Sequence, residues 1–254
     1  MRILRQTSTR TWATIGLINL LIVALMGVIM CLKFILPMPF VQLKNLQHAH
    51  SHFAFKGWVS HLLMLLLVVI TFRLGKNDPI PHNQNRILWA NLMCSYGMLF
   101  SFIYQGYGVI SILCSTCSIL ISYCFALTFW KDMREQQLDN RIARWFYMAL
   151  VFLLISSVGT FYLAYIMGSH QLEVKRQLSA IYFYLHFQFN GWFFFAIMGL
   201  VSHLLSQLNI LQRATDKLFY TLSIATIPLY LLSILWVKFH SVIYILITIL
   251  VFVQ

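Results

Sequence analysis

The apolar run that decides the fold is TIGLINLLIVALMGVIMCLKFIL, residues 14–36. Its only charged residue is Lys33. About 20 such residues in a helix cross the roughly 30 Å hydrocarbon core of a bilayer. Basic residues precede the run, as in a signal peptide, but it is too long and no small-residue cleavage site follows it. We therefore expect a retained first transmembrane helix.

Similar apolar runs recur along the whole chain. Its 254 residues are 60% hydrophobic and 9% charged, whereas a soluble domain has roughly 25% charged residues. This composition argues against a soluble enzyme and predicts an all-α, polytopic membrane protein of seven to eight transmembrane helices in a lipid bilayer. An eighth run, from Ser241 to Gln254, is too short to span. The other runs lie near 52–72, 87–105, 107–130, 145–168, 180–205 and 218–237.

The formal net charge of +12 reflects basic loops. Such a charge also suits nucleic acid, but no basic stretch with interleaved aromatic residues is present, so we expect no nucleic-acid partner. Basic residues gather on the side of the N-terminus, and the positive-inside rule then predicts a cytoplasmic N-terminus in a bacterial-type inner membrane. Those twelve residues are Arg2, Arg5, Arg10, Arg73, Lys76, Arg86, Lys131, Arg134, Arg141, Arg144, Arg213 and Lys217.

The positions of the charged residues and cysteines relative to the apolar runs limit the possible classes of function. All six carboxylates lie in predicted loops, which disfavours a proton pump or cation transporter. The pair Cys114 and Cys117 resembles a redox motif, but within an apolar helix the two are better explained as packing residues. Lys56 is the only charged residue well inside a helix. It could line a polar cavity or meet an anion, but we expect it to snorkel outwards.

A self-match divides the chain. His52-Phe53-Ala54-Phe55-Lys56-Gly57-Trp58 and His186-Phe187-Gln188-Phe189-Asn190-Gly191-Trp192 share the pattern H-F-x-F-x-G-W, in the second and the sixth predicted helix. Equivalent positions of the two copies therefore lie four predicted helices apart along the chain. We therefore predict two four-helix repeats, residues 1–136 and 137–254.

The residue types of the repeated motif suit a flat cofactor. A histidine in a membrane helix suggests function because it is costly unless paired or bound to a metal. Glycine permits close approach of a ligand, and tryptophan supplies an apolar wall. The predicted cofactor-binding residues are His50, His52, His186, Gly57, Trp58, Gly191 and Trp192. An ordinary tight helix crossing would use the same residue types.

Four histidines surround the first copy of the motif. His48 and His52 are spaced i,i+4 and share a helical face, whereas His50 points roughly the other way. His61 returns to the face of His50 but lies about 16 Å further along the axis, too far for one shared metal ion. The candidate metal ligands are His48, His52, His61 and His186.

The pattern His-x-His-x-His-Phe-x-Phe-x-Gly-Trp, with a second histidine at His186, resembles the catalytic subunit of the haem-copper oxidase superfamily and its small membrane relatives, including haem- and copper-containing proteins linked to the nitric oxide response. The resemblance implies four-helix arcs, a haem ligand at His52 or His50 and a metal ligand at His186. The chain lacks the His-Pro-Glu-Val-Tyr pattern, paired histidines in the seventh helix, and a tenth helix. A complete oxygen-reducing centre therefore cannot be assembled from this chain alone.

We thus expect a membrane protein that binds haem, with copper as a second candidate, for electron transfer or the handling of a gas such as nitric oxide. If it is an enzyme at all, it is an oxidoreductase, and no residue is assigned to catalysis. Its expected partners are respiratory-complex subunits or a second copy. The alternatives are a non-enzymatic accessory protein for assembly or for metal or haem transport, and a cofactor-free protein whose histidines pack helices.

Overall fold

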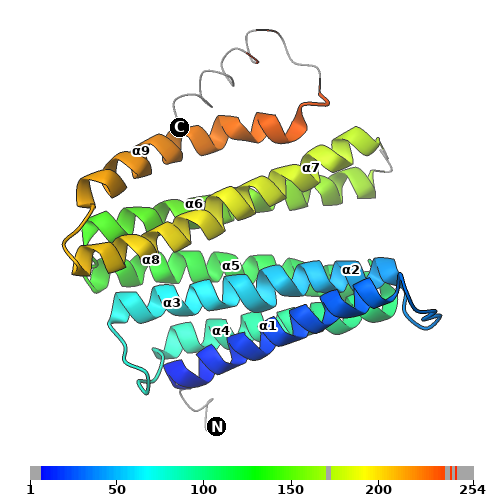
Figure 1. Ribbon diagram of the computed structural model, residues 1–254, viewed down its shortest axis with the longest axis horizontal. Coiled ribbons are helices and arrows are strands. Elements are labelled where there is room, and N and C mark those ends of the chain that lie inside the picture. Colours follow the sequence, from blue (N-terminus) through cyan, green and yellow to red (C-terminus); the bar gives the residue numbers. More distant parts are fainter. Residues whose placement is uncertain (1–6, 170–172, 238–240, 242–243, 245–254) are drawn as a thin grey trace. The chain divides into compact units, whose positions relative to one another are not determined.

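The computed structural model describes residues 7–169, 173–237, 241 and 244. All regular structure in these residues is helical, and an isolated bridge joins Ser8 to Pro79. Seven of the helices that it describes are long and apolar enough to cross a membrane (Figure 1). The prediction of an all-α, polytopic membrane protein is thereby confirmed.

The chain divides into two compact units, Met1–Gln137 (unit 1) and Leu138–Gln254 (unit 2). Unit 1 contains four long helices that lie alongside one another (Figure 1). The second of these helices is unbroken, but it changes from α-helix to π-helix and then back to α-helix. The elements are α1 (Thr9–Leu32), α2 (Leu43–His52), the π-helix η1 (Phe53–Ser60), α3 (His61–Phe72), α4 (His82–Gln105) and α5 (Val109–Glu135).

Unit 2 has three long helices in its described part. Its elements are α6 (Asn140–Gly168), α7 (Val174–His186), the π-helix η2 (Phe187–Phe193), α8 (Phe194–Gln207), α9 (Gln212–Leu229) and the 3₁₀-helix η3 (Tyr230–Ile234). The short eighth run predicted from Ser241 lies, except for residues 241 and 244, outside the described residues. A second four-helix repeat therefore stays a prediction.

Two helices begin earlier than the apolar runs indicated. The second crossing helix starts at Leu43 rather than near residue 52, and the sixth at Val174 rather than near residue 180. The added segments are polar but still helical, and α2 buries Leu46 and Ala49 on one side. Hydropathy misses such segments because it detects only the apolar part of a helix. His48 and His50 therefore lie within a helix rather than ahead of it.

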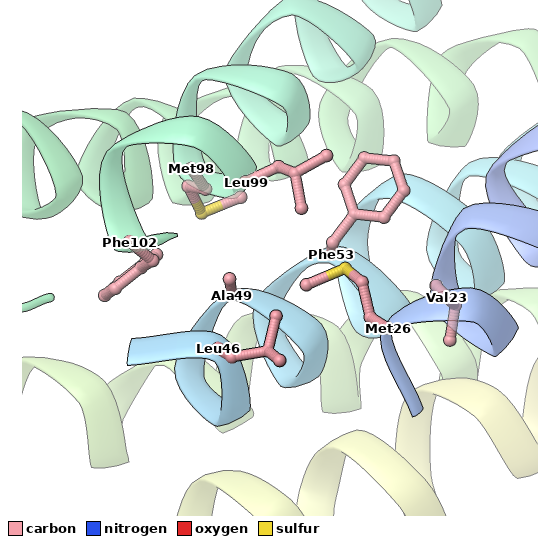
Figure 2. Close-up of a cluster of buried hydrophobic side chains, with 8 residues drawn as sticks. All are labelled: Val23, Met26, Leu46, Ala49, Phe53, Met98, Leu99 and Phe102. Atoms are coloured by element: carbon pink, nitrogen blue, oxygen red, sulfur yellow. The ribbon is translucent and has the colours of Figure 1, made fainter. Parts of the chain in front are cut away.

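Part of the unit 1 core is a cluster of eight buried hydrophobic side chains. Figure 2 shows that it is built from three helices, with Phe53 between the contributions of α1 and α4. Because η1 follows directly after α2, the two elements together present one apolar face to both neighbours. The members are Val23, Met26, Leu46, Ala49, Phe53, Met98, Leu99 and Phe102.

The same unit also buries several hydrogen-bonded polar side chains. Trp12 Nε1 donates to Asn85 Oδ1 at 2.9 Å, and Tyr96 Oη donates to Asn19 Oδ1 at 2.9 Å. Asn19 and Asn85 are fully buried. Hydrocarbon offers no hydrogen bonds, so buried polar groups of a membrane helix need partners on neighbouring helices. The π-helix η1 contacts both groups, because Phe53 belongs to the hydrophobic cluster and the Gly57 carbonyl accepts from Asn19.

Candidate functional site

Both copies of the repeated motif adopt the same unusual winding. η1 begins at Phe53, directly after His52, and η2 begins at Phe187, directly after His186. In a π-helix the hydrogen bonds span five residues, and such segments are frequent at functional sites. From the sequence we expect ordinary α-helix here. The only signal in the sequence was the repetition of the motif itself.

Asparagine side chains hold the π-helix of unit 1. Asn19 Nδ2 of α1 donates to the Gly57 carbonyl at 2.5 Å, and Asn91 Nδ2 of α4 donates to the Lys56 carbonyl at 3.1 Å. These bonds give the backbone oxygens partners that are independent of the helical ladder. Two residues that are distant in sequence thus bond to the backbone of η1.

His61 joins the same polar network. Asn91 Nδ2 also lies 3.3 Å from His61 Nδ1. Because Asn91 donates there, the neutral imidazole carries its proton on Nε2, an atom that is buried without a partner in the described part of the chain. The His61 ring packs 5.2 Å from the ring of Trp12. His61 thus belongs to this polar network, and its role as a metal ligand stays a prediction.

The ammonium of Lys56 points into unit 1. Lys56 is 7% exposed, and its Nζ donates to Ser122 Oγ of α5 at 3.1 Å. Ser122 Oγ in turn donates to the Ser118 carbonyl at 2.9 Å. The expectation that Lys56 snorkels outwards is wrong. Lys56 lies within η1, the helix continues on both sides of it, and its side chain faces α5.

His48 and His52 form an aromatic cluster with two residues near the end of α4. The His52 ring stacks on Phe102, with ring centroids 4.4 Å apart and planes 8° apart. The His48 ring meets Tyr107 edge-on at 4.6 Å. His52 Nε2 lies 3.2 Å from Tyr107 Oη. The i,i+4 spacing thus placed the two histidines on one face, as predicted, whereas the contribution of Tyr107 was missed because no pattern linked residue 107 to helix 2.

His50 lies on the opposite side of α2, against α1. A Cβ atom added at Gly27 of α1 would lie 3.7 Å from His50 Cε1. His61 contacts α1 at Trp12, about four turns away from Gly27. His50 and His61 therefore face the same helix at separate levels. This agrees with the expectation that they cannot share one metal ion.

His186 ends α7 in unit 2 and has partners at both ring nitrogens. Its Nε2 lies 2.8 Å from the Thr226 carbonyl, which can only accept, so this nitrogen carries the proton. Asn190 Nδ2 donates to His186 Nδ1 at 3.1 Å, and Ser233 Oγ lies 3.5 Å from the same atom. In a continuous α-helix the Thr226 carbonyl would accept from the Tyr230 N–H. Where α9 ends and η3 begins, the Tyr230 N–H donates to the carbonyls of Ile227 and Pro228 instead, and the Thr226 carbonyl can accept from His186.

A cavity of about 430 Å³ adjoins His186. Pockets of roughly 300–1,000 Å³ with apolar walls and a few converging polar groups are typical of small-molecule and cofactor sites. Both groups that contact His186 Nδ1 belong to its wall. The lining residues are His186, Asn190, Phe194, Leu222, Thr226, Leu229, Leu232 and Ser233.

The glycines and tryptophans of the motif mainly pack protein against protein. A Cβ atom at Gly191 would lie 2.5 Å from Cβ of Phe152, so this glycine brings α6 close to η2. A Cβ atom at Gly57 would meet the Phe53 ring at 2.7 Å. Trp192 is fully buried, and Trp58 packs at the edge of the hydrophobic cluster of unit 1. Of the predicted cofactor-binding set, these four residues line no part of the cavity beside His186.

The structure thus brings His48 and His52 together and places His186 in the other compact unit. Within the described ranges, no group of three or more His, Cys, Asp or Glu residues is arranged to hold a metal ion. No family model matches this chain, and no curated protein or solved structure is significantly similar to it. The resemblance to the haem-copper oxidase superfamily therefore rests on the motif residues alone.

Proposed function

We propose that this chain is an integral membrane protein that binds haem in unit 2, with His186 as a ligand of the iron. The single observation that carries the proposal is the cavity of about 430 Å³ with an oriented imidazole on its wall. Haem bound there would supply one-electron transfer or the binding of a small gas such as nitric oxide.

The hydrogen bonds of His186 fit this role. Metal-ligating histidines typically donate their second ring N–H to a carbonyl or carboxylate, which fixes the tautomer and the ring orientation. The Thr226 carbonyl accepts such a bond from Nε2. The lone pair of Nδ1 is then directed at Asn190 and Ser233, two flexible side chains of the cavity wall that a ligand can displace.

The walls of the cavity fit the flat, apolar face of a porphyrin. Phe194, Leu222, Leu229 and Leu232 supply the apolar surface, against which a flat apolar group can pack. Asn190, released from Nδ1, remains a hydrogen-bond donor beside the site. Copper, which imidazole also suits, is the second candidate cofactor.

Absorption spectra test this proposal. The protein is purified in detergent after expression with haem supplied, and oxidised and dithionite-reduced spectra are recorded with haem quantified as pyridine haemochrome. We expect about one haem per chain in the parent and its loss in His186→Ala. His203→Ala is the matched control, because His203 lies on α8 of the same unit and bonds to Gln207. Absence of haem from the parent, or unchanged haem in His186→Ala, would contradict the proposal.

The proposed setting is a bacterial-type inner membrane, with the N-terminus in the cytoplasm and with respiratory-complex subunits or a second copy of the chain as partners. The distribution of basic residues between alternate loops supports this orientation. His52, the equivalent histidine of the first copy, belongs to unit 1 and is argued separately below.

A further inference from the structure

We propose that His48, His52 and Tyr107 of unit 1 form a site for one divalent transition-metal ion of the kind that imidazole and phenol ligands prefer, with Cu²⁺ as the first candidate and Zn²⁺ as the second. The inference is independent of haem binding in unit 2, because it uses other residues in the other compact unit.

The three side chains converge from two segments that are distant in sequence. His48 and His52 lie one turn apart on α2, and both rings contact Tyr107, at centroid distances of 4.6 and 6.1 Å. His52 Nε2 is already 3.2 Å from Tyr107 Oη. A metal ion bound to His52 and Tyr107 would replace the hydrogen bond between them.

The second observation that supports this metal site concerns Nε2 of His48. His48 Nε2 is buried and has no hydrogen-bond partner among the residues that the structure describes. Buried polar atoms are nearly always hydrogen-bonded, so an unpartnered one calls for an explanation, of which a bound ion is one. The ring that carries this nitrogen meets the Tyr107 ring edge-on, and Tyr107 is also the residue that His52 Nε2 approaches.

Packing fixes the ligands in place. The His52 ring is held by its stacking on Phe102, which is fully buried in the hydrophobic cluster of Figure 2. Tyr107 follows Gly106, whose φ of +62° makes the turn out of α4. A Cβ atom there would also approach Asn45 Oδ1 to 2.6 Å, so only glycine fits. The turn therefore delivers the phenol to the histidine face of α2.

The chemistry of these atoms selects the metal. Two imidazole nitrogens and one phenol oxygen suit Cu²⁺ and Zn²⁺, whereas Mg²⁺ and Ca²⁺ prefer sites built from several carboxylate and carbonyl oxygens. Three protein ligands would leave a position for water or an exchangeable ligand. Because Tyr107 is 49% exposed, ions have access to the site.

Copper binding to the full chain tests this inference. Detergent-purified protein is stripped with a chelator and titrated with Cu²⁺, and binding is followed by electron paramagnetic resonance and by competition with Zn²⁺. We expect about one Cu²⁺ per parent chain, with nitrogen hyperfine structure. His48→Ala and His52→Ala should each weaken binding at least tenfold. Tyr107→Phe should keep the nitrogen signal but lose any phenolate-to-copper charge-transfer band.

Controls separate loss of the ligand from loss of the fold. His82→Ala changes an exposed histidine at the start of α4 and should bind Cu²⁺ like the parent. His52→Gln preserves a hydrogen-bonding side chain beside Tyr107 but is a poor ligand, so its size-exclusion profile should match the parent while its affinity falls. Cu²⁺ binding that is unchanged in both His48→Ala and His52→Ala would overturn the inference.

The two proposals fail separately. His186→Ala should lose haem and keep Cu²⁺ binding, whereas His48→Ala should lose Cu²⁺ binding and keep haem. If His52→Ala instead loses haem and leaves Cu²⁺ binding unchanged, the metal-ion site is overturned and His52 is a haem ligand.

Discussion

Lys56 is the residue whose burial has the clearest energetic consequence. Its ammonium lies inside unit 1 and donates to Ser122 Oγ. Removing one partner of a buried polar pair leaves the other unsatisfied, whereas replacing the charged group by an apolar one of similar shape is often neutral or stabilising. We expect Ser122→Ala to lower the free energy of unfolding by about 1–3 kcal/mol, and Lys56→Met to leave it unchanged or raise it.

Thermal unfolding of the detergent-purified variants checks this prediction. The double variant Lys56→Met/Ser122→Ala should be no less stable than Lys56→Met alone, because the unpaired ammonium is then absent. A large loss of stability in Lys56→Met would show that an unidentified partner holds the ammonium.

A second residue-scale prediction concerns two glycines of α6. A Cβ atom at Gly159 would lie 2.6 Å from the Ala180 carbonyl oxygen and 2.8 Å from the Tyr184 nitrogen, both backbone atoms of α7 that cannot move aside singly. Small residues allow such close crossings in membranes. We expect Gly159→Ala to lower the unfolding free energy by about 1–3 kcal/mol.

Gly168 of the same helix is the matched control. A Cβ atom there meets nothing within 4 Å, so Gly168→Ala should be neutral or slightly stabilising, in line with the higher helix propensity of alanine. The comparison is made by thermal unfolding in one detergent. Equal melting temperatures for the two variants would disprove the close crossing of α6 and α7.

At the scale of elements, both copies of the repeated motif form a π-helix, η1 in unit 1 and η2 in unit 2. In unit 1, Asn19 and Asn91 each donate to a carbonyl of η1. We expect Asn19→Ala and Asn91→Ala each to cost about 1–3 kcal/mol of stability and to speed amide hydrogen exchange across residues 53–60. Asn83→Ala, at an exposed position of α4, is the control and should change neither quantity. Unaltered exchange in the first two variants would mean that the π-winding holds without these bonds.

At the scale of the whole molecule, the loop charges predict an orientation. Phe40, in the loop between α1 and α2, should face the outside, and Lys76, between α3 and α4, the cytoplasm. In a cysteine-free background, an impermeant maleimide should label Phe40→Cys in intact cells and Lys76→Cys only after lysis. The native cysteines must be removed first, since some of them are exposed. The reversed labelling pattern would invert the proposed topology.

The sequence by itself determined the membrane class, seven of the crossing helices and the shared face of His48 and His52. These features are local. Hydropathy depends on the composition of about 20 consecutive residues, and residues share a helical face when they are three or four positions apart. The ends of helices 2 and 6 were misjudged for the same reason, because their polar turns carry no apolar signal.

Only the tertiary structure decided the state of each candidate functional side chain. The tautomer of His61 depends on Asn91 of α4, that of His186 on a carbonyl of α9, and the burial of Lys56 on Ser122 of α5. Tyr107 reaches His52 only because α4 and the turn at Gly106 bring it there. Each of these partners is 30 or more residues away in sequence, and no short-range pattern encodes a hydrogen bond or a helical winding that depends on which helices pack together.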